Sequence, residues 1–554
     1  MLKKSSLFIV FTFVLCSCSL GGSIDAEPSI ANPSSSNETS SEDSFPYQDY
    51  YFDSASSNGD GTIENPYSSL LDIAKITFNE GTRLFFKCGS LFSAPLELKN
   101  LSGTKDHPIL LTSYGEGSLP KIAGNDISGK GVVYLLNCSC LILENLEIYD
   151  TSRTEKDRRG VLVELTNPNN TNDILTYSSI ALRHLSIHDI HGYSDAENAG
   201  MATSSKITGG IHLWSKDGRA RIDGFEVSDC TIKNVSNVGI ATWYQVNGTK
   251  VNKVSPYDSK FERSSHKNVL LARNEISYIA KNGIFVRNLF GGAIIDNVLH
   301  DTATTCKAGN TIVTSYVDST LVERNEGYRN MAQKQSNGKF QDGAMLDSDL
   351  QSRNVIFQYN YSHDNSFGLF LNCNASGQYD AGAKDNVTLR YNLSLADKGN
   401  KGIIYLNYYV GKVDCYNNTI VTSSSTSPIL LQVKDDRSLQ FYNNLIYAHS
   451  SSSLDLGNKA KLVMEKNLFY SSSSDIQNLN DVIGDYYSFD PLAQRNLEND
   501  EFSRAGFDNG IVYAYMGEKR LFDSNHSVSI PSRPKDILGN SYNNSIGCVN
   551  QNIA

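Results

Sequence analysis

Hydrophobic and polar positions between residues 130 and 475 repeat a short phrase: a hydrophobic strand, one or two polar residues, an Asn, and a second hydrophobic run. The Asn residues of this phrase are Asn145, Asn274, Asn297, Asn325, Asn360, Asn392, Asn418, Asn444 and Asn467. From Asn274 onward their spacing ranges from 23 residues (274 to 297) to 35 residues (325 to 360). A repeat that has a minimum length but stretches freely is typical of a solenoid whose turns tolerate insertions.

Each copy of the phrase contributes short strands rich in Val, Ile, Leu and Tyr, which are too short for helices and too apolar for loops. We expect the Asn at the bend between two strands, because its side chain tolerates left-handed backbone and bonds neighbouring backbone groups. In stacked turns these residues would form a ladder at the strand spacing of about 4.7–4.9 Å. The pattern predicts an all-β parallel β-helix. A β-sandwich would need tight two-residue hairpins and a propeller a blade period near forty, and the sequence shows neither.

Several strands open with a Gly followed by a hydrophobic residue, and they start at Gly210, Gly239, Gly283, Gly343, Gly368 and Gly402. Because side chains alternate along a strand, we predict that the first and third positions after the Gly face the core and that the second, fourth and sixth face outward. The fourth position holds Trp214, Trp243, Arg287, Asp347, Asn372 and Leu406. His212, at a second position, is a weaker candidate for substrate contact.

Because equivalent positions of successive turns stack, these outward residues should form one row. The row predicts a groove with aromatic rings at one end and carboxylates in the middle. Sugars present apolar ring faces and fixed hydroxyls, so such a row suits a glycan. We expect the longest insertions, near residues 151–178, 191–208, 245–265 and 331–341, to form the walls of the groove. The alternative is that the outward polar residues are simply solvated.

The densest cluster of acidic residues lies between residues 341 and 350, in the sequence QDGAMLDSDL. Asp347 and Asp349 are two residues apart on one strand, so both should point outward about 6–7 Å apart, and Asp342 lies at the bend before the strand. Asp364 follows Asp342 by 22 residues and is expected near that bend in the next layer. Because like charges repel, we expect at least one of these acids to stay protonated near neutral pH. A protonated acid beside an ionised carboxylate is the equipment of glycoside hydrolysis.

Two His residues, His300 and His363, each precede an Asp at a bend after an Asn phrase. Their equivalent positions indicate a structural role in bonding the turn. His363 has a second interpretation, because it adjoins the Asp cluster in sequence and could bond a sugar hydroxyl or orient a carboxylate.

The chain ends suggest export and a tether. Residues 1–17 combine two lysines with a short apolar stretch, as a signal peptide does, and the tetrapeptide that ends at Cys18 resembles a bacterial lipobox. That resemblance implies cleavage before Cys18, lipidation of its thiol and a cell-surface, extracellular lipoprotein; an ordinary secretory signal is the alternative. Residues 18–47 are rich in Ser and poor in large apolar residues, which predicts a disordered tether.

Charge and cysteine content narrow the classes of function. The formal net charge of −11 argues against a nucleic-acid partner, and makes a purely electrostatic grip on an acidic polysaccharide awkward unless a cation mediates it. Of ten Cys, eight follow Cys18 without CxxC or Cys/His pairing, so a metal cluster is not expected. Five in strand phrases are expected as buried thiols: Cys138, Cys140, Cys230, Cys373 and Cys415.

The segment YYFDSASSNGDGTIENPYSSL, with EGTRLFFKCGSLF and GTKDHPILLTSYG after it, resembles the opening of bacterial right-handed β-helix proteins of the pectate-lyase-like superfamily. With the sequences at Asp490, Asp536 and Ile546, the resemblance covers residues 48 to about 550. It implies a single-stranded right-handed parallel β-helix solenoid with loop insertions forming a cleft, in a carbohydrate-processing protein. We divide it into N-terminal capping turns (48–130), the β-helix with its active-site loops (131–475), and C-terminal turns with a cap (476–554).

Asp342, Asp347 and Asp349 form a DGxxxDxD phrase similar to that of β-helix glycosidases of the lacto-N-biosidase type, whose catalytic pair is two Asp seven residues apart. That resemblance implies Asp342 as the general acid/base and Asp349 as the nucleophile or base partner. Asp347 would tune the pair or bind a hydroxyl.

Two other functions stay open. A calcium-dependent polysaccharide lyase would bind Ca²⁺ with the Asp cluster and use Lys339 or Arg287 as its base. A non-catalytic glycan-binding protein of the cell surface would use the same Asp residues to cap turns or hold a structural ion. The working hypothesis is a monomeric hydrolase without a cofactor that acts on a neutral or host-type poly- or oligosaccharide.

Overall fold

The computed structural model describes residues 45–488 except 58, 170, 194–207, 247–249, 252–257, 374–385, 408–410, 435–437, 458–461 and 473–474. The chain divides into two compact units, Met1–Phe45 and Pro46–Ala554, and all described strands belong to the second. The signal peptide, Cys18, nearly all of the tether and the C-terminal cap beyond residue 488 lie outside the described residues.

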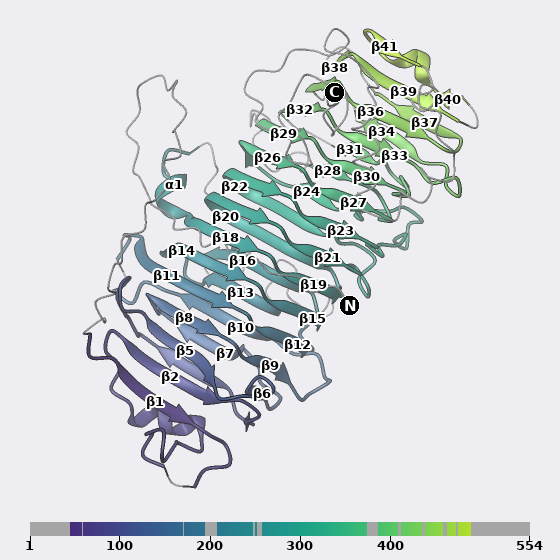
Figure 1. Ribbon diagram of the computed structural model, residues 1–554. Helices are drawn as coiled ribbons and strands as arrows, with labels where there is room; N and C mark the ends of the chain where they lie inside the picture. Colours follow the sequence, from purple (N-terminus) through teal and green to yellow (C-terminus); the bar gives the residue numbers. More distant parts are fainter. Residues whose placement is uncertain are drawn as a thin grey trace, which may run out of the picture. The chain divides into compact units, whose positions relative to one another are not determined.

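The second unit is a parallel β-helix in which each complete turn supplies three strands. In one turn these are β13 (Gly209–Ser215), β14 (Ala220–Ser228) and β15 (Thr231–Val235), which pair in parallel with β16, β18 and β19 of the next turn. First and second strands form one 27-stranded sheet, and third strands form a 14-stranded sheet (Figure 1). The predicted right-handed β-helix is confirmed.

The remaining elements follow the same order. The other first strands are β4 (Leu96–Lys99), β7 (Lys130–Leu136), β10 (Arg158–Leu165), β16 (Val238–Val246), β20 (Asn282–Ile295), β22 (Ile312–Glu323), β24 (Leu346–Ser348), β28 (Phe370–Asn372), β31 (Ile404–Leu406), β34 (Ile429–Val433), β37 (Ser452–Asp455) and β40 (Ile476–Gln477). The other second strands are β1 (Gln48–Phe52), β2 (Thr82–Lys87), β5 (Ile109–Tyr114), β8 (Leu141–Glu144), β11 (Leu175–Arg183), β18 (His266–Ala272), β25 (Ser352–Arg353), β26 (Val355–Gln358), β29 (Asn386–Arg390), β32 (Lys412–Tyr416), β35 (Ser438–Tyr442) and β38 (Leu462–Glu465). The other third strands are β3 (Leu91–Phe92), β6 (Lys121–Gly124), β9 (Glu147–Asp150), β12 (Ser186–Ile190), β19 (Glu275–Ile279), β21 (Val298–His300), β23 (Glu326–Tyr328), β27 (Tyr361–His363), β30 (Leu393–Leu395), β33 (Thr419–Val421), β36 (Leu445–Ala448), β39 (Asn467–Ser471) and β41 (Tyr486–Tyr487). The long strands β20 and β22 also supply the second position of their turns, where they pair with β18, β25 and β26. Outside the three columns lie β17 (Lys250–Val251), which is the twenty-seventh strand of the larger sheet, α1 (Phe261–Ser264), η1 (Leu70–Lys75) and η3 (Leu479–Asp481).

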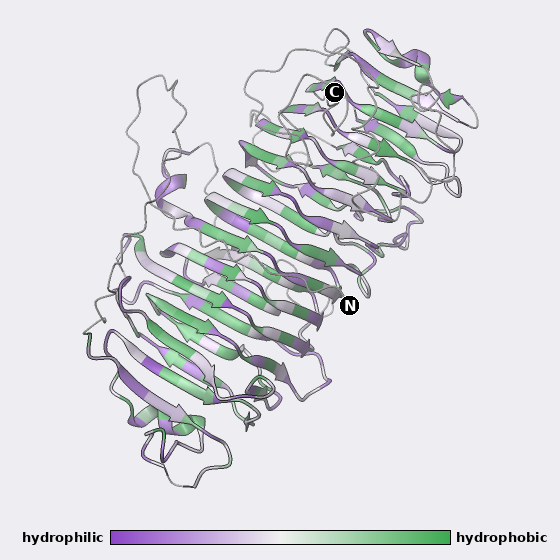
Figure 2. Cartoon of the chain, viewed as in Figure 1, coloured by the Kyte–Doolittle hydropathy of each residue, from purple (hydrophilic) through white to green (hydrophobic). Residues whose placement is uncertain are grey.

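One apolar core runs through the stacked turns. The alternation of hydrophobic and polar residues along the strands is visible in Figure 2. The inward position of the first strands shows how the core continues from turn to turn, since its residues pair in register: Val133, Val161, Ile211, Ile240, Ile284, Ile312, Leu346, Phe370, Ile404 and Leu431. All ten are buried.

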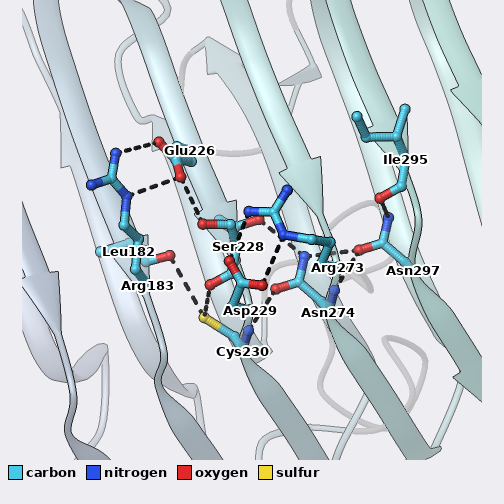
Figure 3. Close-up of polar contacts among 11 residues, drawn as sticks. Leu182, Arg183, Glu226, Ser228, Asp229, Cys230, Arg273, Asn274, Ile295 and Asn297 are labelled. Atoms are coloured by element: carbon cyan, nitrogen blue, oxygen red, sulfur yellow. Dashed lines mark hydrogen bonds and ion pairs between the residues drawn. The ribbon is translucent and has the colours of Figure 1, made fainter. Parts of the chain in front are cut away.

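The predicted Asn ladder is present from Asn274 to Asn467. At each step the backbone N–H and the side-chain Nδ2 of one Asn donate to Oδ1 of the next; for Asn274 and Asn297 both distances are 2.9 Å. Figure 3 shows how the ladder starts, where the backbone N–H of Cys230 donates to Oδ1 of Asn274 over 3.1 Å. These Asn residues are buried, so the ladder satisfies backbone groups that water does not reach.

Of the two reasons expected for Asn at this bend, the hydrogen bonds of its side chain are confirmed and its tolerance of left-handed backbone is wrong. The left-handed residue is the one before each ladder Asn: Arg273, for example, has φ 54°, whereas Asn274 does not have positive φ. Asn145 has φ 57° and occupies that preceding position, and its Nδ2 donates to Thr112, so it lies outside the ladder. The Asn side chain is therefore needed for its hydrogen bonds and not for its backbone conformation.

The described cysteines are free thiols. The five expected ones are Cys138, Cys140, Cys230 and Cys415, which are buried, and Cys373, which is half-buried. Burial raises the pKa of Cys230 to about 12, so this thiol is unreactive.

Candidate active site

Two outward-facing rows run along the first strands, and strand register defines them. Row one contains Tyr134, Leu162, His212, Ala241, Phe285, Val313, Asp347, Leu371, Tyr405 and Gln432. Row two, two residues further along each strand, contains Leu136, Glu164, Trp214, Trp243, Arg287, Ser315, Asp349, Cys373, Asn407 and Lys434. Row two is therefore the row of aromatics and carboxylates that the sequence predicted.

The member that aligns with the Trp residues is Asp349, and the prediction that Asp347 does so is wrong. Ile284, one residue after Gly283, pairs through Ile312 with Leu346, which is three residues after Gly343. The corner before β24 thus contains two more residues, and counting from the Gly misplaces the strand by two positions.

The prediction that Asn372 faces outward is also wrong. Asn372 pairs with Leu406, a core residue, so it lies in an inward position and is 1% exposed. Its Nδ2 donates to the carbonyl of Ser348 over 2.9 Å. In β28 and β31 the first two positions after the Gly are both in the core, which reverses the expected alternation.

Asp347 is 5% exposed and lies between Val313 and Leu371 in row one. Its Oδ2 accepts a hydrogen bond from Nδ2 of Asn310 over 2.7 Å. The side-chain oxygen of the same Asn310 accepts from the backbone N–H groups of Gly343 (2.8 Å) and Ala344 (2.9 Å). Asn310 therefore fixes both Asp347 and the backbone next to Asp342. Sequence reasoning missed Asn310, because this residue lies outside every repeated phrase.

Asp342 and Asp349 are both half-buried; Asp349 directly follows β24, and Asp342 lies four residues before the strand begins. The backbone N–H of Asp349 donates to Thr314, which holds the residue in row two beside Cys373. Burial, followed by the charges of Asp349, Asp347 and Asp342, raises the pKa of the Cys373 thiol. All three carboxylates therefore act electrostatically on the same thiol.

A hollow of about 580 Å³ lies further along rows one and two, where its lining begins two turns after Asp347 and Asp349. Its lining residues are Lys334, Gly338, Lys339, Phe340, Asn400, Lys401, Tyr405, Asn407, Ile429, Gln432 and Lys434. Tyr405 donates through its hydroxyl to Asn407 over 2.9 Å, and Asn407 reaches Sγ of Cys373 over 3.6 Å. The insertion expected as a wall near 331–341 does line this hollow. The other lining residues were missed, since the Gly402 strand was counted in the wrong phase.

Both Trp residues stand next to each other in row two, as predicted. Trp243 is 3% exposed; its ring lies 5.7 Å from that of Phe285 and 5.1 Å from the guanidinium of Arg287. Trp214 is more open and has the cations of Arg159 and Lys216 within 5.6 Å of its ring. Of the two, Trp214 is the better placed to meet a ligand.

The two His residues named for substrate contact are placed differently from each other. His212, in row one, is 1% exposed. His363 belongs to β27 in the 14-stranded sheet, whereas the Asp cluster lies on the 27-stranded sheet. Its ring stacks on Tyr328 at 4.5 Å, and its nitrogens bond Asp364 (2.8 Å) and Glu326 (3.2 Å).

His300 makes similar contacts two turns before His363, with Asp301 at 2.6 Å and with the ring of Tyr328, which lies in the turn between the two His residues, at 4.8 Å. The structure therefore shows the turn-bonding arrangement for both His residues. The carboxylate of Asp364 is engaged by His363, with 2.8 Å between Oδ2 and Nδ1.

Within the described part of the chain, no group of three or more His, Cys, Asp or Glu is arranged to hold a metal ion. In the same residues no helix is long and apolar enough to cross a membrane.

Comparison with known proteins agrees with the β-helix fold. The chain is 24% identical to a lacto-N-biosidase of Bifidobacterium longum subsp. longum; the match covers 87% of this chain and 34% of the relative, so the chain spans about a third of its length. Crystal structures of the GH136 lacto-N-biosidase from Eubacterium ramulus match with TM-scores of 0.55 (native protein, 22% identity) and 0.54 (selenomethionine derivative, 20% identity). Each match covers 76% of this chain and 67% of that chain. No family model matches.

These findings define the class of protein by its fold: a parallel β-helix that is similar, over most of its length, to a lacto-N-biosidase. The particular resemblance that the DGxxxDxD phrase indicated, to β-helix proteins of the lacto-N-biosidase type, is confirmed.

Proposed function

We propose that this protein is a glycoside hydrolase that cleaves an oligosaccharide in the groove formed by rows one and two. The observation that carries the proposal is the placing of the acidic segment in rows one and two: Asn310 ties Asp347 to the backbone next to Asp342, and Asp349 follows in row two. The similarity to lacto-N-biosidases over most of this chain supports the same class of reaction.

In this proposal Asp342 is the general acid/base and Asp349 is the nucleophile or base partner. Glycosidases of this kind protonate the leaving oxygen with one carboxyl group, while the other attacks the sugar or activates a water. Both residues are half-buried, so they are shielded from bulk water yet open to substrate. Asp347 is buried and hydrogen-bonded, which suits a residue that orients the pair or binds a hydroxyl.

The test is hydrolysis of a glycan panel by wild type, Asp342→Asn and Asp349→Asn. We expect new reducing ends from wild type, with kcat lower by about 10²–10⁴-fold in each variant, because Asn neither donates nor accepts the catalytic proton. Asp414→Asn, on β32 and away from rows one and two, is the matched control and should keep full activity.

Two further readouts separate the hydrolase from its alternatives. Unsaturated uronate, absorbing near 235 nm and lost on adding EDTA, would show a calcium-dependent lyase. Binding without cleavage of any glycan would show a binding protein.

We also propose that the protein is a cell-surface lipoprotein attached through Cys18. The lipobox-like sequence before Cys18 supports this. Metabolic labelling with a radioactive fatty acid should label wild type and not Cys18→Ala; equal labelling would contradict the assignment.

A further inference from the structure

Four lysines surround the hollow, and they come from three separate segments. Lys334 and Lys339 are exposed on the segment before β24, Lys401 lies at the corner before β31, and Lys434 follows β34. Among the described residues that line the hollow, none is acidic. The whole chain has a formal net charge of −11, so the positive charge of this cluster is opposite in sign to that of the chain as a whole.

Lys401 is the best-defined of the four. It is half-buried, and its Nζ lies 4.7 Å from the ring centre of Tyr405 and 5.7 Å from that of Phe367. These aromatic rings fix the direction of the ammonium group without neutralising it. Burial lowers the pKa of Lys401; Asp342 opposes this effect, whereas Lys434 and Lys339 add to it.

Two acids near the hollow do not balance the four cations. Asp342 acts on Lys401 electrostatically but belongs to the proposed catalytic pair. Asp455 accepts from Gln432 over 2.5 Å and lies 3.6 Å from Lys434, and its side chain is 48% exposed. A negatively charged ligand group would therefore gain attraction from several ammonium groups that repel one another in its absence.

We propose that this hollow binds an anionic substituent, a carboxylate or a sulfate ester, on the glycan that the proposed active site cleaves. The inference rests on the proposed function and names its substrate class. Asn407 follows Asp349 by two turns in row two, about 10 Å at the usual strand spacing, so the two sites face one ligand. Asn400, Asn407 and Gln432 supply partners for hydroxyls, and Tyr405 and Phe340 supply aromatic surface for a sugar ring.

The test measures binding to the catalytically blocked Asp349→Asn protein by calorimetry. The probes are a neutral oligosaccharide that the wild type cleaves, or the neutral glycan of the panel that binds most tightly if none is cleaved, and its sialylated and sulfated derivatives. We expect at least one charged derivative to bind about tenfold more tightly than the neutral form, and the sialylated and sulfated arms identify which anion is preferred. Raising NaCl from about 0.05 to 0.5 M should remove most of the difference.

Lysine variants show which side chains cause the preference for the charged derivative. Lys401→Gln and Lys434→Gln, in the Asp349→Asn background, should each lower it about tenfold, and Lys401→Arg should largely keep it, since the charge remains. Lys412→Gln is the matched control: Lys412 is an exposed lysine of β32 that pairs with Asp414 and does not line the hollow.

The outcomes separate the two proposals. Cleavage of neutral glycans together with equal binding of charged and neutral forms overturns this inference and leaves the hydrolase standing. A lysine-dependent preference without cleavage of any glycan overturns the hydrolase and keeps the anionic site. A preference that survives both lysine changes, or no binding by any probe, overturns this inference.

Discussion

At the scale of single residues, Asn310 and His363 show how hydrogen bonds assign roles that residue type does not. Asn310 is 2% exposed and bonds both Asp347 and the backbone at Gly343, so one amide positions the whole acidic segment. His363 stacks among tyrosines between two carboxylates on another sheet. Each acts through its neighbours, and each gives a measurable prediction.

Replacing Asn310 with Ala should lower kcat by about 10–100-fold and change KM less. The reason is that Asp347 and the Gly343 backbone lose the group that orients them. The free energy of unfolding should fall by about 1–3 kcal/mol, since buried polar groups lose a partner. Asn310→Asp keeps the acceptor for Gly343 but faces Asp347 with a second carboxyl group, so its pH–rate profile should shift. An unchanged profile would mean that Asn310 supports only the fold. Asn386→Ala, an exposed position on β29, is the control.

The stability of the protein should fall between about pH 6.5 and 9 because of His363. Burial works against its charge, but hydrogen bonds to Asp364 and Glu326 outweigh burial and raise the pKa of His363 to about 9. The folded state thus holds the proton more tightly than the unfolded state. The stabilisation is complete below about pH 6.5 and is lost as the pH rises through about 9, up to about 3 kcal/mol.

Urea unfolding of wild type and His363→Gln across this range would measure the effect. The variant should show a flatter dependence on pH. Burial lowers the pKa of His266 to about 4, so the folded state keeps this residue neutral across the range. His266 is present in both proteins, so its contribution cancels when wild type and variant are compared. Identical slopes in the two proteins would contradict the assignment to His363.

At the scale of elements, the bends decide which residues face outward. The Asn phrase predicts the bend before each third strand because the ladder needs one Asn per turn at a fixed place. The bend before the first strands has no such marker: the core position is the first residue after Gly283 but the third residue after Gly343. The fold was therefore predictable from the repeat, whereas the row that contains Asp349 was not.

Asn360→Ala should lower the free energy of unfolding by about 3–5 kcal/mol. Asn360 is fully buried, bonds Asn325 and Asn392, and donates to the carbonyl of Val322, so its loss leaves several buried groups without a partner. Asn467→Ala, at the last rung, should cost less. Denaturant unfolding measures both changes, and equal losses at the two positions would contradict a cooperative ladder.

At the scale of the whole molecule, stacking of turns makes stability local, since each turn contacts mainly its neighbours. The proposed active site uses residues from β22 to β34, and the first turns are far from it in the stack. Damage to the first turns should therefore spare the site, and damage to its own turns should not.

Phe86→Ala and Phe357→Ala test this expectation. Both residues are fully buried in the same continuous core, and each change should cost its turns about 3–5 kcal/mol. In rising urea, Phe86→Ala should lose part of its far-UV circular dichroism before its activity. Phe357→Ala, on β26, should lose activity at lower urea than wild type. If circular dichroism and activity were lost together in both variants, the β-helix would unfold as one unit.

The sequence by itself determined the parallel β-helix, its Asn ladder and the Asp342–Asp349 segment, because these follow from local periodicity and from residues close together in the chain. The tertiary structure alone decided that Asp349 joins the Trp row, that Asn372 turns inward and that His363 lies on another sheet. It also brought Lys334, Lys401 and Lys434 to one hollow. The physical reason is register: corners of variable length set the phase of each strand, and hydrogen bonds between turns, which no single repeat contains, fix it.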